Sequence, residues 1–80
     1  MSEKLVPLTS LKAGDSGRVV AILGGRGAFR RLQALGVRIG KKIVKKSEAF
    51  MRGPVTVQVE GTQIGIGYGV ASKILVEVWK

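Results

Sequence analysis

The sequence predicts a mainly β fold, a small barrel of about five strands with one short helix inserted after the first long strand. Several short segments alternate apolar and polar residues with a period of two, as half-buried strands do. Twelve glycines are available for the turns and bends between them. The chain has 80 residues, enough for one domain. Closing so small a sheet would remove its exposed edges, which favours a barrel.

The clearest pattern lies between residues 54 and 67. Valine alternates with polar residues over 55–60, which predicts a strand with one buried face. Gly61–Thr62 is suited to a tight turn, and the alternation resumes over 64–66. We therefore expect a β-hairpin here.

Three further segments complete the expected strands. Gly17–Leu23 is β-branched and apolar on both faces, which predicts a central strand with a covered outer side. Residues 41–47 fit a strand with Ile43 directed inward, and residues 74–79 fit a terminal strand. Pro7–Leu11 is typical of a short turn that tucks its two leucines under the barrel.

The expected helix runs from Gly27 to Leu35. Ala28, Leu32 and Leu35 fall at positions i, i+4 and i+7, which places them on one apolar stripe. Gly36 follows as the glycine that commonly ends a helix. We expect this helix to cover the outer side of the first long strand.

Two glycine-rich segments have more than one interpretation. Gly24–Gly27 leads into the helix, where free N–H groups can cradle a phosphate, but a strand-to-helix turn needing positive φ is the commoner use of such glycines. Gly65, Gly67 and Gly69 lie where a strand is expected to bend sharply.

Positive charge is concentrated in the middle of the chain. Fourteen Lys and Arg residues face five Asp and Glu residues, a formal charge of +9. One basic face is expected, suited to an acidic protein, nucleic acid or anionic headgroups, or only to solubility. Its predicted members are Arg26, Arg30, Arg31, Arg38, Lys41, Lys42, Lys45, Lys46 and Arg52.

The residues for catalysis and metal binding are absent or scattered. There is no histidine and no cysteine, and the five carboxylates lie in different segments. We expect no catalytic residue, no cofactor and no metal site, and hence no enzyme. The start from Met1 shows no secretory signal, and the longest apolar run is about five residues where a membrane span needs about 20.

A positive mean hydropathy of +0.22 in a chain with 24% charged residues predicts apolar surface outside the core. The helix and its flanks combine arginines with leucines, a mixture typical of protein interfaces. Either leucine of the pair 32 and 35 can equally be core. The predicted partner-binding residues are Arg26, Arg30, Arg31, Leu32, Leu35, Arg38, Lys41 and Lys42.

Taken together, four segments resemble the FeoA family over nearly the whole chain. They are Leu8-Thr9-Ser10-Leu11, the helix ending Arg30-Arg31-Leu32-Gln33-Ala34-Leu35-Gly36, Gly53-Pro54-Val55 before the alternating strand, and Val70-Ala71-Ser72-Lys73-Ile74. The sequence departs from the family at Gly65–Gly69, where members often carry alanine and arginine.

The resemblance implies a single FeoA-like domain over residues 1–80, an SH3-like barrel. It implies a cytoplasmic accessory or regulatory protein of ferrous iron uptake that binds FeoB, a membrane transporter with a cytosolic GTP-binding domain. Through that partner the protein would lie at the inner face of the membrane. Whether it changes GTP hydrolysis or assembly is left open, as is its oligomeric state.

Two alternatives remain at this stage. A basic small barrel can bind nucleic acid, although Phe29, Phe50, Tyr68 and Trp79 are scattered and do not form a stacking platform, so nucleic acid is the less favoured partner. The barrel is also similar to the C-terminal SH3-like domain of metal-dependent repressors. A start at Met1 and the absence of a helix-turn-helix argue against such a fragment.

Overall fold

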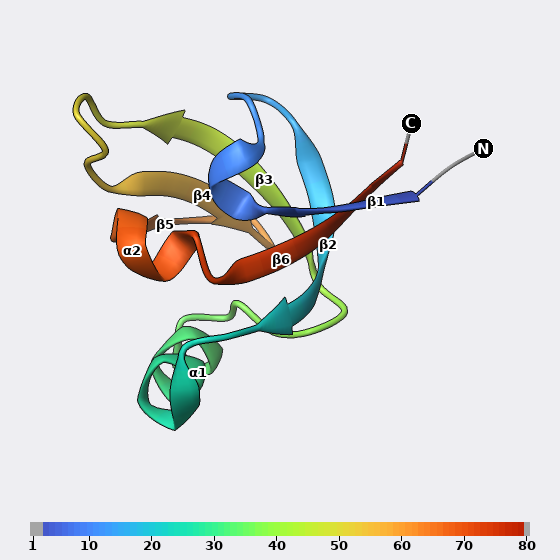
Figure 1. Cartoon of the computed structure of the whole chain (residues 1–80), viewed down its shortest axis with the longest axis vertical. Helices are drawn as coiled ribbons and strands as arrows, with labels where there is room; N and C mark the ends of the chain where they lie inside the picture. Colours follow the sequence, from blue (N-terminus) through green and yellow to red (C-terminus); the bar gives the residue numbers. More distant parts are fainter. Residues whose placement is uncertain (1–2, 80) are drawn as a thin grey trace.

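The computed structural model describes residues 3–79, which form one antiparallel sheet with short helical segments around it (Figure 1). Met1 and Ser2, part of the segment in which no secretory signal is expected, lie outside the described residues. The elements are β1 (Glu3–Pro7), the 3-10 turn η1 (Leu8–Ser10), β2 (Ser16–Ile22), α1 (Gly25–Ala34), β3 (Lys42–Glu48), β4 (Val55–Val59), β5 (Thr62–Ile66), α2 (Tyr68–Ala71) and β6 (Ile74–Trp79).

The sheet has the strand order β1-β6-β2-β3-β4-β5, with every neighbouring pair antiparallel. β2 lies between β6 and β3, so the prediction of a central first long strand is confirmed. The three valines of β4 are all buried, as the alternation predicted. They pack with Ile43 of β3 and Val76 of β6 in one hydrophobic core.

The hairpin of β4 and β5 turns one residue earlier than predicted. Its two loop residues are Glu60 and Gly61, because Val59 and Thr62 already pair. Both loop residues have positive φ, 50° and 82°, the geometry that matches the twist of a two-residue hairpin. Glycine at the second position meets this need without strain.

The strand β1 was not predicted, so the sheet has six strands where about five were expected. β1 pairs with β6 from Glu3 to Pro7, yet its Leu5 side chain is 60% exposed. Backbone pairing with β6 and the partly buried Val6 hold this edge strand, and its side chains carry no clear alternating pattern. The turn that follows is confirmed, with Leu8 and Leu11 both buried.

The expected closure of the barrel is wrong. The sheet curls, but its edge strands β1 and β5 do not pair within the described residues. η1 follows β1, α2 follows β5, and these two segments pack against each other. Leu8 of η1 and Ala71 of α2 are fully buried. The contact between η1 and α2 thus stands where a closed barrel would have hydrogen bonds between β1 and β5.

The helix α1 begins and ends through glycines. Gly24 and Gly25 have φ of 100° and 90°, so the need for positive φ accounts for both and supports the turn interpretation of this segment. At the other end Gly36 has φ of 99°, and the N–H groups of Gly36 and Val37 donate to the carbonyls of Gln33 and Leu32. This is a Schellman end, as the position of Gly36 predicted.

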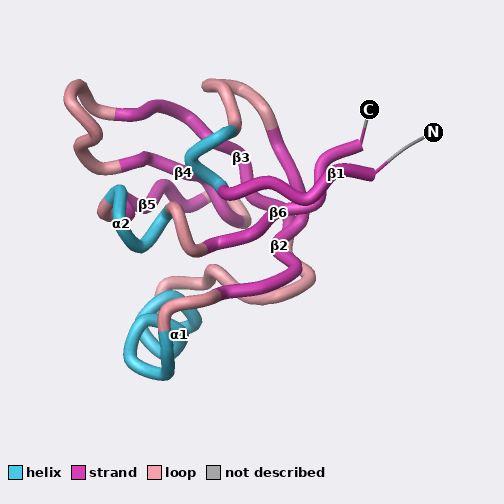
Figure 2. Tube along the Cα trace, in the orientation of Figure 1, coloured by secondary structure: helices cyan, strands magenta, loops and turns pink. Residues whose placement is uncertain are grey.

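The position of α1 differs from the prediction. The helix lies beyond the end of β2 rather than over the outer side of that strand (Figures 1 and 2). It buries Leu32 fully, while Phe29 is half-buried and Leu35 is exposed. The long excursion between β2 and β3 therefore places α1 at one end of the sheet, with much of its surface free.

Candidate functional site

The helix α1 presents three exposed arginines, Arg26, Arg30 and Arg31. Its first turn contains Arg26 and no acidic residue. A cation at a helix N-terminus faces the positive end of the helix dipole, which is mildly unfavourable. Arg31 lies in the last turn, where a cation is favourable, so Arg26 is the residue whose charge does not serve helix stability. All three side chains lie where a partner can reach them.

A groove lies between α1 and the end of β5. Its volume is about 220 Å³, and its lining combines side chains of α1 with the bare backbone of β5 and the start of α2. Leu32 is 2% exposed and belongs to the core, whereas Leu35 is 45% exposed. The lining residues are Arg31, Leu32, Leu35, Gly65, Ile66, Gly67 and Val70.

Of the glycines predicted to mark a sharp bend, Gly67 and Gly69 lie where the chain leaves β5 and enters α2, whereas Gly65 lies within the strand. Gly65 pairs regularly with Thr56 inside β5, and neither Gly65 nor Gly67 has positive φ. A Cβ atom added at either position would meet nothing within 4 Å. These glycines leave the groove open beside the strand. Sequence reasoning singled out the segment but missed this use, because only the fold brings it next to α1.

The other predicted partner-binding residues do not all lie at the groove. Arg38 is exposed, and its Nε donates to the backbone carbonyl of Gln33 at 3.3 Å. Lys41 forms an exposed ion pair with Glu60, with 3.1 Å between Nζ and Oε2. Lys42 lines a separate pocket together with residues of β2.

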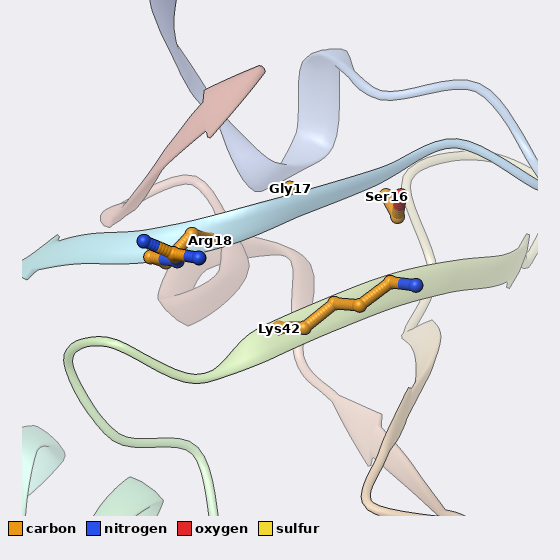
Figure 3. A pocket seen from close by; sticks show the side chains of 4 residues that line it. All are labelled: Ser16, Gly17, Arg18 and Lys42. Atoms are coloured by element: carbon orange, nitrogen blue, oxygen red, sulfur yellow. The ribbon is translucent and has the colours of Figure 1, made fainter. Parts of the chain in front are cut away.

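That second pocket lies on neighbouring strands β2 and β3 and holds about 150 Å³ (Figure 3). Its lining residues are Ser16, Gly17, Arg18 and Lys42. Arg18 has Lys42 of β3 as its cross-strand partner on one side and Glu77 of β6 on the other, so an acidic residue stands beside the two like charges. In Figure 3 the Lys42 side chain extends along β3 toward Ser16. Lys42 and Arg31 therefore line different pockets.

Lys45 was predicted on the basic face, and the structure shows that this is wrong. Its side chain is buried, with the residue 3% exposed. Its Nζ donates to the carbonyls of Thr9 at 3.2 Å and Leu11 at 2.6 Å, and to Glu48 Oε1 at 2.6 Å. Lys45 points to the same side of β3 as Ile43, so it ties β3 to the chain around η1.

Apolar side chains outside the core are present, in agreement with the hydropathy. Leu23 precedes α1, Leu35 ends it and Ile39 follows it, and all three are about half exposed. Phe50 and Met51 stand exposed in the loop between β3 and β4. The surroundings of α1 thus combine apolar and cationic surface.

Two further findings limit the chemistry of the described residues. Within residues 3–79, no group of three or more His, Cys, Asp or Glu side chains is placed to hold a metal ion. No helix in the same range is long and apolar enough to span a membrane.

The topology and the groove define a small antiparallel β domain with a helix set beside an open strand edge. The model of the FeoA domain matches residues 6–78, and the chain therefore belongs to the FeoA family. The match covers all the strands except the start of β1 and the end of β6.

Known relatives agree with this assignment. Over 73 residues the chain is 40% identical to the protein named "Putative Fe(2+) transport protein A" of Methanocaldococcus jannaschii, covering 91% of this chain and 87% of that protein. It is similar to the crystal structure of an iron uptake regulatory protein (FeoA), with a TM-score of 0.82 and 36% identity, covering 91% of this chain and 95% of that one.

A manganese-dependent transcriptional repressor also shares the fold. Its TM-score is 0.87 at 18% identity, and the match covers 99% of this chain but 44% of the repressor. At this identity the likeness concerns the fold alone. The predicted SH3-like fold is confirmed by these neighbours, and the family to which the chain belongs is one of accessory transport proteins rather than of enzymes.

Proposed function

We propose that this protein is a cytoplasmic accessory protein of ferrous iron uptake that binds a FeoB-type transporter and regulates it. Membership of the FeoA family and the Fe(2+) transport protein of Methanocaldococcus jannaschii support a role in iron transport. The chain acts as a single binding domain and reaches the membrane through its partner.

The observation that carries this proposal is the surface of α1. The helix contributes little to the core, presents three arginines and borders a groove of mixed polar and apolar lining. Interfaces are enriched in arginine, and apolar anchors that fill pockets supply much of their affinity. An acidic patch on the cytosolic part of the transporter would be steered toward this helix by a chain of charge +9.

Within this surface the predicted residues take different roles. Arg26, Arg30 and Arg31 supply charge, and Leu35 supplies the exposed apolar contact beside the groove. Leu32 acts from beneath, as the buried floor. Arg38 and Lys41 lie in the loop after α1 and contribute charge at the margin, whereas Lys42 belongs to the pocket on β2 and β3.

The test is binding of purified protein to the cytosolic domain and to the full transporter, with and without guanine nucleotide, at low and physiological salt. Arg30→Glu with Arg31→Glu should weaken binding by at least about tenfold and reduce its salt dependence, because both charges are reversed. Exposed charges contribute little to stability, so the free energy of unfolding should change by less than about 1 kcal/mol.

A matched control reverses two charges elsewhere. Arg18→Glu with Lys42→Glu changes the net charge by the same amount but acts on β2 and β3. If both double variants weaken binding equally, net charge rather than α1 drives it. If the wild-type protein binds neither form of the transporter at either salt concentration, the docking proposal is wrong.

Regulation is tested separately from binding. GTP hydrolysis and oligomeric state of the transporter are measured with and without saturating protein. A change in either that the Arg30→Glu, Arg31→Glu variant fails to produce supports regulation through α1. Binding that alters neither quantity contradicts the regulatory part of the proposal and leaves the docking part standing.

A second candidate function is nucleic-acid binding through the pocket of Arg18 and Lys42. Two cations opposite each other on neighbouring strands suit a phosphate group. The test is affinity for mixed DNA and RNA at low salt, which should fall steeply with added salt and be lost in the Arg18→Glu, Lys42→Glu variant. Equal affinity in the variant would exclude this pocket.

A further inference from the structure

The strand β5 ends the sheet and has a free edge. It pairs with β4 on one side, and within residues 3–79 no strand pairs with its other side. Such an edge presents unpaired backbone N–H and C=O groups, to which an extended segment of another protein can add as a further strand.

The register of the hairpin decides which backbone groups point outward. The two-residue turn makes Val59 and Thr62 a hydrogen-bonded pair, because a tight turn closes through its first and fourth residues. Antiparallel pairs alternate between hydrogen-bonded and non-hydrogen-bonded types. Gly65, opposite Thr56, falls on a non-hydrogen-bonded pair. Its N–H and C=O groups therefore point away from β4, toward the free edge.

The groove beside α1 lies at the same point of the strand. Gly65 and Gly67 line it from one side, and Arg31 and Leu35 line it from α1. A Cβ atom added at either glycine would meet nothing within 4 Å, so no side chain fills the groove on this face of the strand. A free strand edge beside a groove lined by a helix offers main-chain hydrogen bonds for affinity and a pocket for side-chain specificity.

We propose that the edge of β5 at Gly65 accepts an extended segment of an acidic protein partner, which lies as an added strand between β5 and α1. An apolar side chain of the segment enters the groove of about 220 Å³, and an acidic side chain pairs with Arg31. The identity of the partner rests on the proposed function, under which the segment belongs to the cytosolic part of the FeoB-type transporter.

Charge favours an acidic partner over a second copy of this chain. Each copy carries a formal charge of +9, and α1 contributes Arg31 to the lining of the groove. Pairing two copies along β5 would bring these arginines together, and like charges at an interface are unfavourable. An acidic segment instead gains from the same residue.

The experiment follows the Gly65 amide in isotope-labelled protein. Short peptides covering the cytosolic segments of the transporter, and acidic peptides selected from a displayed library, are added in turn. A bound peptide should protect the Gly65 N–H from hydrogen exchange and shift the signals of Arg31 and Leu35. Protection of an edge amide is a readout that a contact through side chains alone would not produce.

Two variants at one position separate the backbone from the side chain. Gly65→Pro removes the outward N–H at an edge position that tolerates proline, and binding should fall by at least about tenfold. Gly65→Ala keeps the N–H and should change binding by less than about threefold. A thermal unfolding transition checks that both variants fold. If Gly65→Pro does not fold, the proposal is tested by whether a bound peptide protects the Gly65 N–H of the wild-type protein from hydrogen exchange.

The outcomes distinguish this proposal from the docking function. If the transporter binds wild type and Gly65→Pro equally, and Gly65 stays unprotected, the added strand is wrong while docking stands. If only a library peptide protects Gly65, the strand edge stands and the transporter is the wrong partner. No protection by any peptide overturns the proposal. Protection that rises with protein concentration alone, together with a dimer in sedimentation, overturns the acidic partner in favour of a second copy.

Discussion

The β4–β5 hairpin and the helix α1 both show clear apolar periodicity, yet they use it differently. β4 buries each of its valines, whereas α1 buries Leu32 and leaves Leu35 45% exposed. The hairpin closes over the core, and α1 lies beyond the end of β2 (Figure 1). Similar patterns thus serve stability in one region and an open surface in the other, depending on what packs against them.

The largest effect is expected in the hairpin. Val57→Ala removes two methyl groups from a fully buried position and should lower the free energy of unfolding by about 2–3 kcal/mol through lost burial and the cavity left behind. Urea unfolding measures it. Gln58→Ala, on the other face of β4, is the control, and an equal loss there would contradict the assignment of faces.

The next largest effect on stability is expected at Lys45, a lysine that is buried. Lys45→Met keeps the length of the side chain but leaves the carbonyls of Thr9 and Leu11 without their donor, which should destabilise the fold by about 2 kcal/mol. Lys42→Met, three residues earlier and exposed, should stay within about 0.5 kcal/mol. Equal effects in chemical unfolding would mean that the Lys45 contacts contribute nothing.

Two glycines give the third test, since one is required by backbone geometry and the other is not. Gly36→Ala places a Cβ atom at φ of 99° and should cost about 1 kcal/mol of stability. Gly65 does not have positive φ, and a Cβ atom added there has no neighbour within 4 Å. Gly65→Ala should therefore leave the stability almost unchanged. Thermal unfolding of both variants decides. A large loss at Gly65 would show that β5 needs a glycine for the fold.

The smallest effect on stability is expected at the groove. Leu35→Ser removes an apolar side chain that is about half exposed and should change the free energy of unfolding by less than about 1 kcal/mol. The same change should weaken transporter binding by several-fold, because an apolar contact is lost. A variant that is strongly destabilised would place Leu35 in the core and remove the contrast between α1 and the hairpin.

Much of the sheet was predictable because its signals are local. The period of two in β4, the glycine at the hairpin turn and Gly36 after α1 each report on their own neighbours in the chain. β1 was missed because its place depends on pairing with β6, which lies at the other end of the chain. Lys45 was misplaced because a lysine in a strand is expected to be exposed. Its burial depends on the carbonyls of Thr9 and Leu11, which accept its hydrogen bonds and come from a distant segment.

The candidate site was predictable in part. Arg30, Arg31 and Leu35 are visible in the sequence as a mixed cationic and apolar helix. Gly65 and Gly67 could be noticed but not interpreted, since their role depends on the distance between β5 and α1. Lys42 could not be assigned to its own pocket, because cross-strand partners such as Arg18 follow from the register.

The sequence by itself determined that this protein is mainly β, has no histidine or cysteine, and resembles the FeoA family. These properties follow from local periodicity, composition and the order of motifs. Only the tertiary structure decided that the sheet stays open, that Lys45 is buried, and that the end of β5 lies beside Arg31 and Leu35 of α1. Each of these depends on contacts between residues far apart in the chain, which no local pattern encodes.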